Sequence, residues 1–240
     1  MEEEKAVRIR FNQILHTEMS KNFELKPIPF DPELQTKYSA RGDKSVYIKS
    51  ELLGCTKTAG VRFGEMDFGG SMIVNFGSIP PAKDYSFPIL GCTFLYASKF
   101  LIAVLDLHPI SKDKEYTNKY IAPLEDISGR YKWIPAVEGG RSEVHEWAKI
   151  YDSGYSFYRW CDKKYLPNVE DAFRDYINVF CECVKKAEPL TDQEVISARD
   201  KYMEKYRYDY ALRDPGSSPL KTHFGDDWGE RFVKDFLFAP

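Results

Sequence analysis

The sequence lacks the motifs by which most cofactor-binding proteins are identified. It contains no GxGxxG fingerprint after a strand, no phosphate-binding GxxxxGK[ST] loop, no GxSxG nucleophile elbow and no HExxH zinc motif. No apolar stretch reaches the ~18 residues that a membrane span requires. The first residues, Met1-Glu-Glu-Glu, carry three acidic side chains and do not resemble a targeting segment. We therefore expect no resident nucleotide, flavin or metal and no membrane anchor.

Cysteine, histidine and excess positive charge are also scarce. The cysteines are Cys55, Cys92, Cys161, Cys181 and Cys183, and the histidines are His16, His108, His145 and His223. No CxxC pair occurs and the cysteine count is odd, which favours free thiols in a reducing compartment. The net charge of −3 gives no global basic excess of the kind that binds nucleic acid. These absences predict neither a metal site nor a nucleic-acid partner.

The 240 residues are 43% hydrophobic and 15% aromatic, which suits a sizeable core. The aromatic side chains either fill that core or line a pocket for a flat apolar ligand, and composition leaves both readings open. No repeat, low-complexity tract or interdomain linker interrupts the chain. We therefore expect one domain over residues 1–240.

Hydrophobic patterning divides the chain into a sheet-rich first half and a helix-rich second half. An amphipathic helix is predicted over residues 4–20, with Val7, Phe11, Ile14, Leu15 and Met19 on one side. Residues 24–44 are predicted as loop. Short strands are then predicted at 46–53, 60–68, 71–79, 89–96 and 99–108. The turns between these strands are too short for parallel crossovers, so the strands form an antiparallel meander.

The second half adds one more strand at 155–161 and then long helices. Asn168 is predicted to cap the first helix, and residues 191–194 form a capping box that opens the second. A short final helix begins at Asp227. Because most strands precede the long helices in the sequence, we predict an α+β fold with helices packed on the sheet.

Asp106 is the first candidate for chemistry. It lies inside the strand Leu101-Ile-Ala-Val-Leu-Asp-Leu-His108, which is otherwise almost wholly apolar. A carboxylate in an apolar sheet is costly unless it is paired, hydrogen-bonded or protonated. The alternative is a solvated or salt-bridged carboxylate at a strand end.

Two further polar residues stand in unusual settings. Asp214 precedes Pro215, so it should be extended at the exit of the second long helix. If the last helices cover the sheet, Asp106 and Asp214 can meet, and two desolvated acids can deliver protons. Asn75 lies inside the strand at 71–79, where the alternative is a hydrogen bond to neighbouring backbone.

At these residues the chain resembles the ferredoxin-dependent bilin reductases. The resemblance rests on Ala103-Val-Leu-Asp-Leu-His-Pro109 with the charged segment at 112–116, on Asn75 with the segment at 84–91, and on the tail from Arg213. The tail reads Arg213-Asp-Pro-Gly216, followed by His-Phe-Gly-Asp-Asp-Trp-Gly-Glu from His223. Order and spacing suit the family over roughly residues 45–238.

The resemblance implies a single-domain three-layer α/β/α sandwich around a central antiparallel sheet. It implies an open-chain tetrapyrrole, biliverdin IXα or a dihydrobiliverdin, between the sheet and the C-terminal helices. Reduced ferredoxin supplies electrons one at a time and no bound cofactor is needed, so the protein contributes orientation and protons. A monomer is expected, with a downstream bilin reductase as a further partner that receives the product.

The resemblance also implies residue roles. Asp106 matches a sheet aspartate that donates the first proton, and Asp214 matches a helix-side aspartate that protonates or positions the other end of the pigment. Asn75 falls where some members carry histidine, and asparagine there resembles the members that make 15,16-dihydrobiliverdin, phycoerythrobilin or phytochromobilin. The candidates for contacting the substrate, including its propionates, are Arg62, His108, Arg159 and Lys221.

Within the family, the chain looks most like members that reduce the 15,16 double bond of biliverdin in phycobilin biosynthesis. The alternatives are a four-electron reductase that makes phycoerythrobilin or a related phytobilin, and a non-catalytic bilin carrier or lyase. An acidic ferredoxin should dock on a basic face, for which Lys83, Lys112, Lys114 and Lys119 are candidates. We expect a bacterial cytoplasm or, with a transit peptide removed, an algal plastid stroma.

Overall fold

One antiparallel sheet organises the molecule. The computed structural model describes residues 2–42 and 45–240, with side chains from residue 10 onward. The strand order is β1 (Lys26–Pro27), β3 (Val46–Gly54), β4 (Val61–Phe68), β5 (Met72–Ile79), β6 (Ile89–Ala97), β7 (Leu101–His108) and β8 (Phe157–Cys161), and β2 (Thr36–Tyr38) pairs with β3. The predicted antiparallel meander is confirmed, and the predicted strands start and end within two residues of the observed ones.

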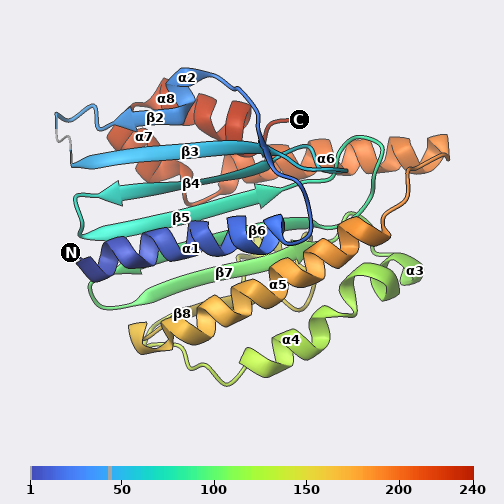
Figure 1. Cartoon of the computed structure of the whole chain (residues 1–240), viewed down its shortest axis with the longest axis horizontal. Helices are drawn as coiled ribbons and strands as arrows, with labels where there is room; N and C mark the ends of the chain where they lie inside the picture. Colours follow the sequence, from blue (N-terminus) through green and yellow to red (C-terminus); the bar gives the residue numbers. More distant parts are fainter. Residues whose placement is uncertain (1, 43–44) are drawn as a thin grey trace.

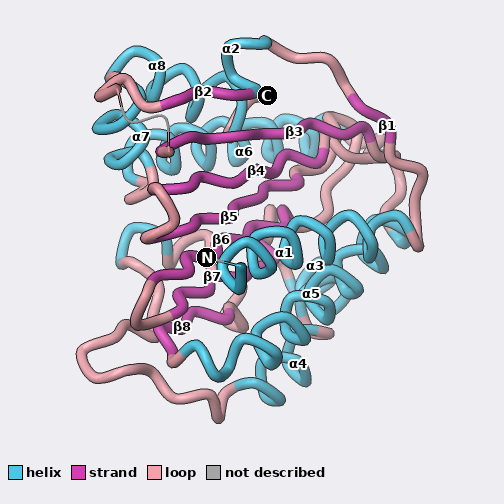
Figure 2. Tube along the Cα trace, turned by 60° about the vertical axis from the view of Figure 1, so that its left-hand side comes forward, coloured by secondary structure: helices cyan, strands magenta, loops and turns pink. Residues whose placement is uncertain are grey.

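Helices cover the sheet on both sides, as Figures 1 and 2 show. On one side lie α1 (Glu2–Ser20), α5 (Leu166–Lys186) and α4 (Leu124–Tyr131). The short helix α3 (Lys114–Tyr116) and the π-helix η1 (Thr117–Ile121) precede α4. On the other lie α6 (Gln193–Arg213), α7 (Ser217–Phe224), α8 (Asp226–Arg231) and η4 (Phe232–Leu237). We call these two sides of the sheet the α5 face and the α6 face. The predicted three-layer α/β/α sandwich is confirmed.

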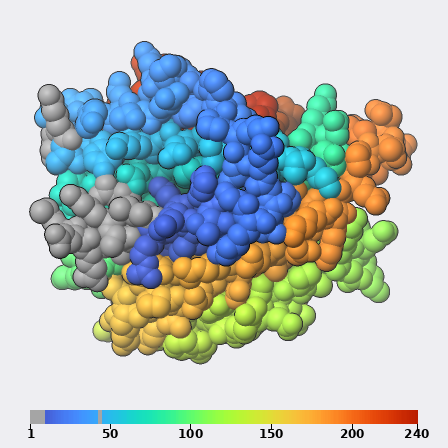
Figure 3. Space-filling model, in the orientation of Figure 1, coloured from blue at the N-terminus to red at the C-terminus, as the bar shows by residue number. Residues whose placement is uncertain are grey.

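Aromatic packing closes the α5 face. The Phe11 ring of α1 stacks on Phe94 of β6 with centroids 3.8 Å apart, and Phe94 meets Phe173 of α5 at 4.8 Å. Figure 3 shows the side chains of α1 and α5 side by side over this face. The apolar stripe predicted for the first helix is confirmed by the burial of Phe11, Ile14, Leu15 and Met19, whereas Val7 lies outside the described side chains.

Several predicted boundaries were wrong for local reasons. The helix α5 begins at Leu166 rather than after Asn168, because Pro167 sits in its first turn, where the missing N–H costs nothing. The helix α6 is capped by Asp192, whose carboxylate accepts from the backbone N–H groups two and three residues later. Residues 24–44, predicted as loop, contain β1, β2 and the short helix α2 (Pro32–Gln35).

The centre of the α6 face is left uncovered. Thr93 is exposed, although β6 has a strand on each side. Cross-strand register puts Phe76 of β5 and Val104 of β7 on the same face as Thr93, and both are only partly buried. Helix α6 instead reaches the ends of the strands, since the Tyr202 hydroxyl donates to the Pro109 carbonyl at 2.6 Å. An apolar floor thus remains open beneath the C-terminal helices.

Candidate functional site

Asp106 is buried on the α6 face and hydrogen-bonded by three donors. Its Oδ1 accepts from the Leu107 backbone N–H at 2.8 Å and from the Ser153 hydroxyl at 2.5 Å. Its Oδ2 accepts from the Ser153 backbone N–H at 3.0 Å. These donors compensate for the desolvation that makes a buried carboxylate costly. The loop that carries Ser153 therefore holds Asp106 in place.

His108 lies next to Asp106, because residues two apart on a strand share a face. Its Nδ1 is 3.4 Å from Asp106 Oδ2 and 3.2 Å from the Tyr151 carbonyl oxygen. Gly91, directly opposite Asp106 on β6, makes room for the imidazole: a Cβ there would come within 2.7 Å of His108 Nε2. The glycine thus allows the ring to lie across the neighbouring strand.

Two tyrosines of α6 lie between the predicted acids. The rings of Tyr206 and Tyr210 are 4.4 Å apart, and each lies 5.6 Å from the His108 ring. Burial raises the pKa of both phenols well above the usual value, and the charges of Asp106 and Asp214 add to that rise. Both aspartates are therefore near enough to act electrostatically on the same pair of rings.

Asp214 ends α6 in the extended conformation that the following proline predicts, with φ −63° and ψ 121°. Its Oδ1 accepts from the Gly216 N–H at 2.6 Å. Burial raises the pKa of this carboxyl, and the Gly216 N–H and the positive potential of His145 oppose the rise. Asp214 therefore retains its proton at a higher pH than an ordinary aspartate does.

A row of facing residues connects Asp106 to Arg62 across four strands. Arg62 pairs with Ser78, Ser78 with Gly91 and Gly91 with Asp106, so all four share the α6 face. Strands ~4.8 Å apart put the ends of this row about 14 Å apart. Two small residues lie between a buried guanidinium and a buried carboxylate.

Arg62 is an incompletely paired buried cation. One of its guanidinium nitrogens, Nη2, donates to the Pro240 carbonyl oxygen at 3.2 Å, whereas Nη1 is buried without a partner among the described residues. Burial and, to a smaller extent, the charge of the nearby Arg207 of α6 together lower the Arg62 pKa to about 10. This pair of cations favours the binding of an anion.

Asn75 does not join this site. It pairs with Phe94 of β6, so its side chain points to the α5 face, away from Asp106. The amide is buried and makes no hydrogen bond within the described part of the chain, so the alternative interpretation, a bond to neighbouring backbone, does not hold either. The next residue, Phe76, faces the α6 side. Adjacent residues of a strand lie on opposite faces, so Asn75 and Phe76 face different helical layers.

Arg159 and Lys221 lie outside the row of residues that joins Arg62 to Asp106. Arg159 pairs with Ala103 and lies on the α5 face, where its guanidinium donates to the carbonyl oxygens of Ile134 and Tyr158. Lys221 is half-buried on α7, where the helix packs closely on Gly229 of α8. Four residues were predicted to contact the substrate. Of these, Arg62 belongs to the row that contains Asp106, and His108 lies next to Asp106.

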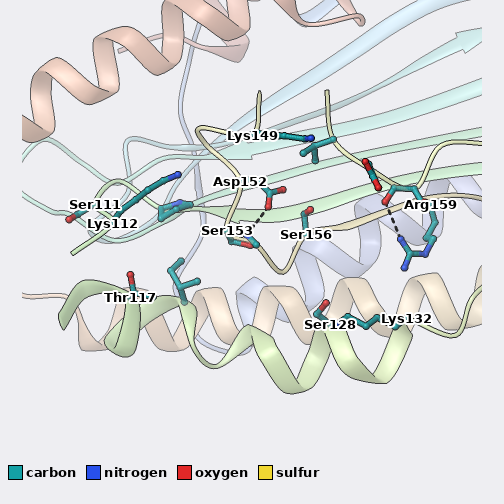
Figure 4. A pocket seen from close by; sticks show the side chains of 16 residues that line it. Ser111, Lys112, Thr117, Ser128, Lys132, Lys149, Asp152, Ser153, Ser156 and Arg159 are labelled. Atoms are coloured by element: carbon teal, nitrogen blue, oxygen red, sulfur yellow. Dashed lines mark hydrogen bonds between the residues drawn. The ribbon is translucent and has the colours of Figure 1, made fainter. Parts of the chain in front are cut away.

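A cavity of about 760 Å³ borders the site on the side opposite the α6 helix. Figure 4 shows Ser128 of α4, and Lys132 directly after α4, across this cavity from Asp152, Ser153 and Ser156. The predicted bilin pocket lies between the sheet and the C-terminal helices, whereas no residue beyond Arg159 lines this cavity. The cavity is therefore distinct from the uncovered floor of the α6 face, and Ser153 of its lining is hydrogen-bonded to Asp106.

Sequence reasoning missed the residues that complete the site. Ser153 follows a tyrosine and an aspartate in an irregular segment, where no periodic pattern marks it. Tyr206 and Tyr210 recur at helical spacing, which by itself indicates core packing, and they do pack, but against His108 of the site. In the described residues no three His, Cys, Asp or Glu side chains gather to hold a metal, and no helix is long and apolar enough to cross a membrane.

Comparison with known proteins gives a consistent result. The family model for ferredoxin-dependent bilin reductase matches residues 12–239. The 15,16-dihydrobiliverdin:ferredoxin oxidoreductases of Nostoc punctiforme and Gloeobacter violaceus are 31% and 29% identical, each over 95% of this chain and 93% of the relative. The phycoerythrobilin:ferredoxin oxidoreductase of Gloeobacter violaceus is 24% identical over 92% of this chain and 90% of its own length.

A solved structure shares the fold. Phytochromobilin synthase from tomato, crystallised in complex with biliverdin, superposes with a TM-score of 0.84 over 95% of this chain and 82% of that chain, at 20% identity. The shared architecture extends across the sheet and both helical layers. It agrees with the α/β/α arrangement described above.

Proposed function

The chain belongs to the ferredoxin-dependent bilin reductases, and from this premise we propose that it reduces biliverdin IXα at the 15,16 double bond to 15,16-dihydrobiliverdin. Two reduced ferredoxins each give one electron and are oxidised, while two protons complete the new C–H bonds. The observation that carries this proposal is that Asp106 of the sheet and Asp214 of the helical layer both act electrostatically on the same buried phenols, Tyr206 and Tyr210 of α6. Such a site supplies protons, whereas the substrate's conjugated system accepts the electrons.

The two aspartates suit different roles because their environments differ. Asp106 is held by hydrogen bonds from the strand and from the loop that carries Ser153, and it delivers a proton from a defined position. Asp214 lies at a helix exit next to a proline, with a raised pKa that favours the protonated acid. Donors on the sheet and on the helix layer can address different carbons of one pigment held between them.

The uncovered floor suits a flat, mainly apolar substrate. Its centre is Thr93, flanked by Val74, Phe76, Leu95 and Val104, which share the α6 face and are partly buried. Covering these side chains with a conjugated pigment removes apolar surface from water and contributes about 25 cal/mol for each Å² buried. We place the pigment on this floor, beneath α6 and the tail.

Arg62 holds a propionate of the pigment in this proposal. It is a buried guanidinium with a free Nη1, near Arg207, and it lies on the same face as Asp106. A guanidinium binds a carboxylate with two parallel hydrogen bonds, which fixes orientation as well as charge. His108, at the other end of the row, contacts the conjugated part of the pigment near Asp106.

Ferredoxin docks at the strand ends next to Asp106. Lys83 follows β5, and Lys112, Lys114 and Lys119 follow β7, so all four exposed lysines lie at one end of the sheet. An acidic partner is steered to such a face by charge, and added salt screens that attraction. We expect turnover to fall as salt is raised from 50 to 500 mM, and a flat response would argue against charge-steered docking.

The direct test is an assay with biliverdin, ferredoxin and a reducing system, followed by absorbance and product chromatography. A 15,16-dihydrobiliverdin product supports the proposal. A phycoerythrobilin product would favour the four-electron reductase, the function that the name of one relative carries. Tight pigment binding with no reduction would favour a carrier or lyase, and the product would also identify the reductase that acts next.

A further inference from the structure

Helix α6 crosses its face of the sheet without covering the centre, where Thr93 is exposed. In the first half of the helix, the Arg199 guanidinium donates to two carbonyl oxygens of the β5–β6 connection at 3.0 and 3.1 Å. The Tyr202 hydroxyl donates to the Pro109 carbonyl after β7. These bonds fix the first half of α6 at the strand ends, and a separate contact fixes the half that leads to Asp214.

The second half of α6 is bound to the loop at 149–156 by three side chains, Tyr151, Asp209 and Lys205, which we call the α6 trio. The Tyr151 hydroxyl donates to Asp209 Oδ2 at 2.5 Å, and the Lys205 ammonium donates to the same oxygen at 2.5 Å. Tyr151 is 1% exposed and Asp209 is 5% exposed. A hydrogen bond to a buried carboxylate is stronger than one between neutral groups, so this contact holds the helix firmly to the loop.

The α6 trio keeps the same protonation states over the pH range of an enzyme assay. Burial, followed by the hydrogen bond to Asp209, raises the pKa of the Tyr151 phenol. The hydrogen bonds from Lys205 and then from Tyr151 lower the pKa of Asp209. Tyr151 therefore remains a donor and Asp209 an ionised acceptor.

Tyr151 also connects the α6 trio to the sheet. Its backbone carbonyl oxygen lies 3.2 Å from His108 Nδ1 of β7. Its ring packs against those of Tyr206 and Tyr210 on α6, with centroids 5.2 and 5.7 Å away. One residue thus meets the sheet through its backbone and the helix through its side chain. Tyr151 therefore fixes where the second half of α6 lies relative to β7.

We infer that Tyr151 and Asp209 are positioning residues for the pigment, because their hydrogen bond holds the second half of α6 at the distance from the sheet that a flat pigment fills. This inference rests on the proposed function, which places the pigment between the floor and α6. Without the bond, the pigment itself must order the helix, and that cost reduces its affinity. The cost falls equally on the bound substrate and on the transition state, so KM rises while kcat changes little. Neither residue transfers a proton or an electron.

A group of the same chemistry on the other side of the sheet provides a matched control. The Tyr131 hydroxyl of α4 donates to Asp175 Oδ2 of α5 at 2.7 Å, and Nη1 of Arg130 lies 2.9 Å from the same oxygen. We call Tyr131, Asp175 and Arg130 the α4 trio. It joins two helices of the α5 face, away from the floor where the pigment is placed. Only the loss of the α6 trio should therefore affect the pigment.

The test compares Tyr151→Phe with Tyr131→Phe, since each removes one hydroxyl and keeps the ring. We expect Tyr151→Phe to raise the KM for biliverdin about tenfold and to change kcat by less than about threefold. The same variant should weaken the visible circular dichroism of bound biliverdin, which reports how rigidly the pigment is held. Tyr131→Phe should keep all three quantities within about twofold of the wild type. Each variant should lower Tm by about 2–4 °C, as expected for one lost hydrogen bond.

Other roles for Tyr151 predict different results. Equal changes of KM in the two variants, or no change in either, overturn the inference, because they indicate a purely structural role. A fall of kcat by about tenfold or more with KM unchanged also overturns it, since the phenol would then act in the chemistry. Should Tyr151→Phe fail to fold, Asp209→Asn replaces it. The amide oxygen accepts from Tyr151 more weakly than the carboxylate, so KM should rise about threefold, and an unchanged KM overturns the inference.

Failure of this inference and failure of the proposed function give different results. If the wild-type protein reduces biliverdin and Tyr151→Phe has the same KM as Tyr131→Phe, the reductase stands and only the positioning role is overturned. If the wild type binds biliverdin but never reduces it, the proposed reduction is wrong, and the dissociation constants of the two variants still test the positioning role. If the wild type does not bind biliverdin, both are overturned.

Discussion

The two faces of the central sheet are built from the same strands yet have opposite character. On the α5 face, Phe94 packs between Phe11 and Phe173, and the surrounding side chains are buried. On the α6 face, its chain neighbour Thr93 is exposed. Alternation along a strand sends adjacent residues to opposite faces, so one strand serves a core and a site at once. The site lies where the helices leave the sheet uncovered.

Asn75 and Phe76, which are adjacent in β5, also lie on opposite faces of the sheet. Asn75 faces the packed helices and Phe76 faces the open floor, where its ring meets Phe232 of η4 at right angles. A shift of one position in a motif comparison therefore moves a residue through the sheet. Polar character alone does not place a residue in a site.

The largest contrast should come from polar substitutions on opposite faces. We expect Asp106→Asn to lower turnover about 10²–10⁴-fold, the range typical of a lost proton donor, with biliverdin still bound. The bound pigment should accept one electron and persist as a radical detectable by electron paramagnetic resonance. Asn75→Ala, on the α5 face, should leave turnover per folded molecule unchanged. Normal turnover by Asp106→Asn would remove this residue from the mechanism.

The next prediction compares two adjacent residues, Phe94 and Thr93, of which the first should affect stability and the second pigment binding. Phe94→Ala should lower the free energy of unfolding by about 3–5 kcal/mol, because it empties part of the aromatic layer. Thr93→Val should change it by no more than about 0.5 kcal/mol, since this side chain is exposed. The same Thr93 variant should alter the absorbance spectrum of bound biliverdin. Chemical denaturation and pigment titration measure the two effects, and equal destabilisation by both variants would contradict the comparison.

A smaller effect is expected from Asp214, and it depends on pH. Burial raises its pKa above the usual aspartate value of 3.8, so the protonated donor persists to higher pH and is lost as the pH rises through the raised pKa. The contribution of Asp214 to turnover should therefore be largest at low pH and disappear above that pKa. Asp214→Asn should lower turnover about tenfold at the low-pH end and abolish this limb of the pH profile. An unchanged profile would mean that another group titrates.

The smallest effect concerns the propionate at Arg62. Arg62→Gln should weaken biliverdin binding about tenfold, equivalent to ~1.4 kcal/mol. Biliverdin dimethyl ester, whose propionates are neutral, should bind the wild type and the variant about equally. Arg159→Gln, on the α5 face, is the matched control and should leave both affinities unchanged. Equal loss for the acid and the ester would show that Arg62 acts through the fold.

By itself, the sequence determined the strands, the antiparallel meander, the long helices and the two aspartates in unusual settings. These features follow from hydrophobic period, turn residues and the restriction that a proline imposes on the residue before it, all of which are local. The family resemblance rested on short motifs that the sequence also carries. The pattern did not show that Asn75 and Asp106 lie on opposite faces of the sheet.

Only the tertiary structure decided what surrounds the aspartates. Ser153 meets Asp106 across 47 positions, and Tyr210 approaches His108 across 102. The helices pack against the strand ends and leave Thr93 open, which depends on how the layers fit together. Such long-range contacts arise from packing of distant segments, and no local period encodes them. The sequence identified the acids, and the fold determined their neighbours, the open floor beside them and the cavity behind them.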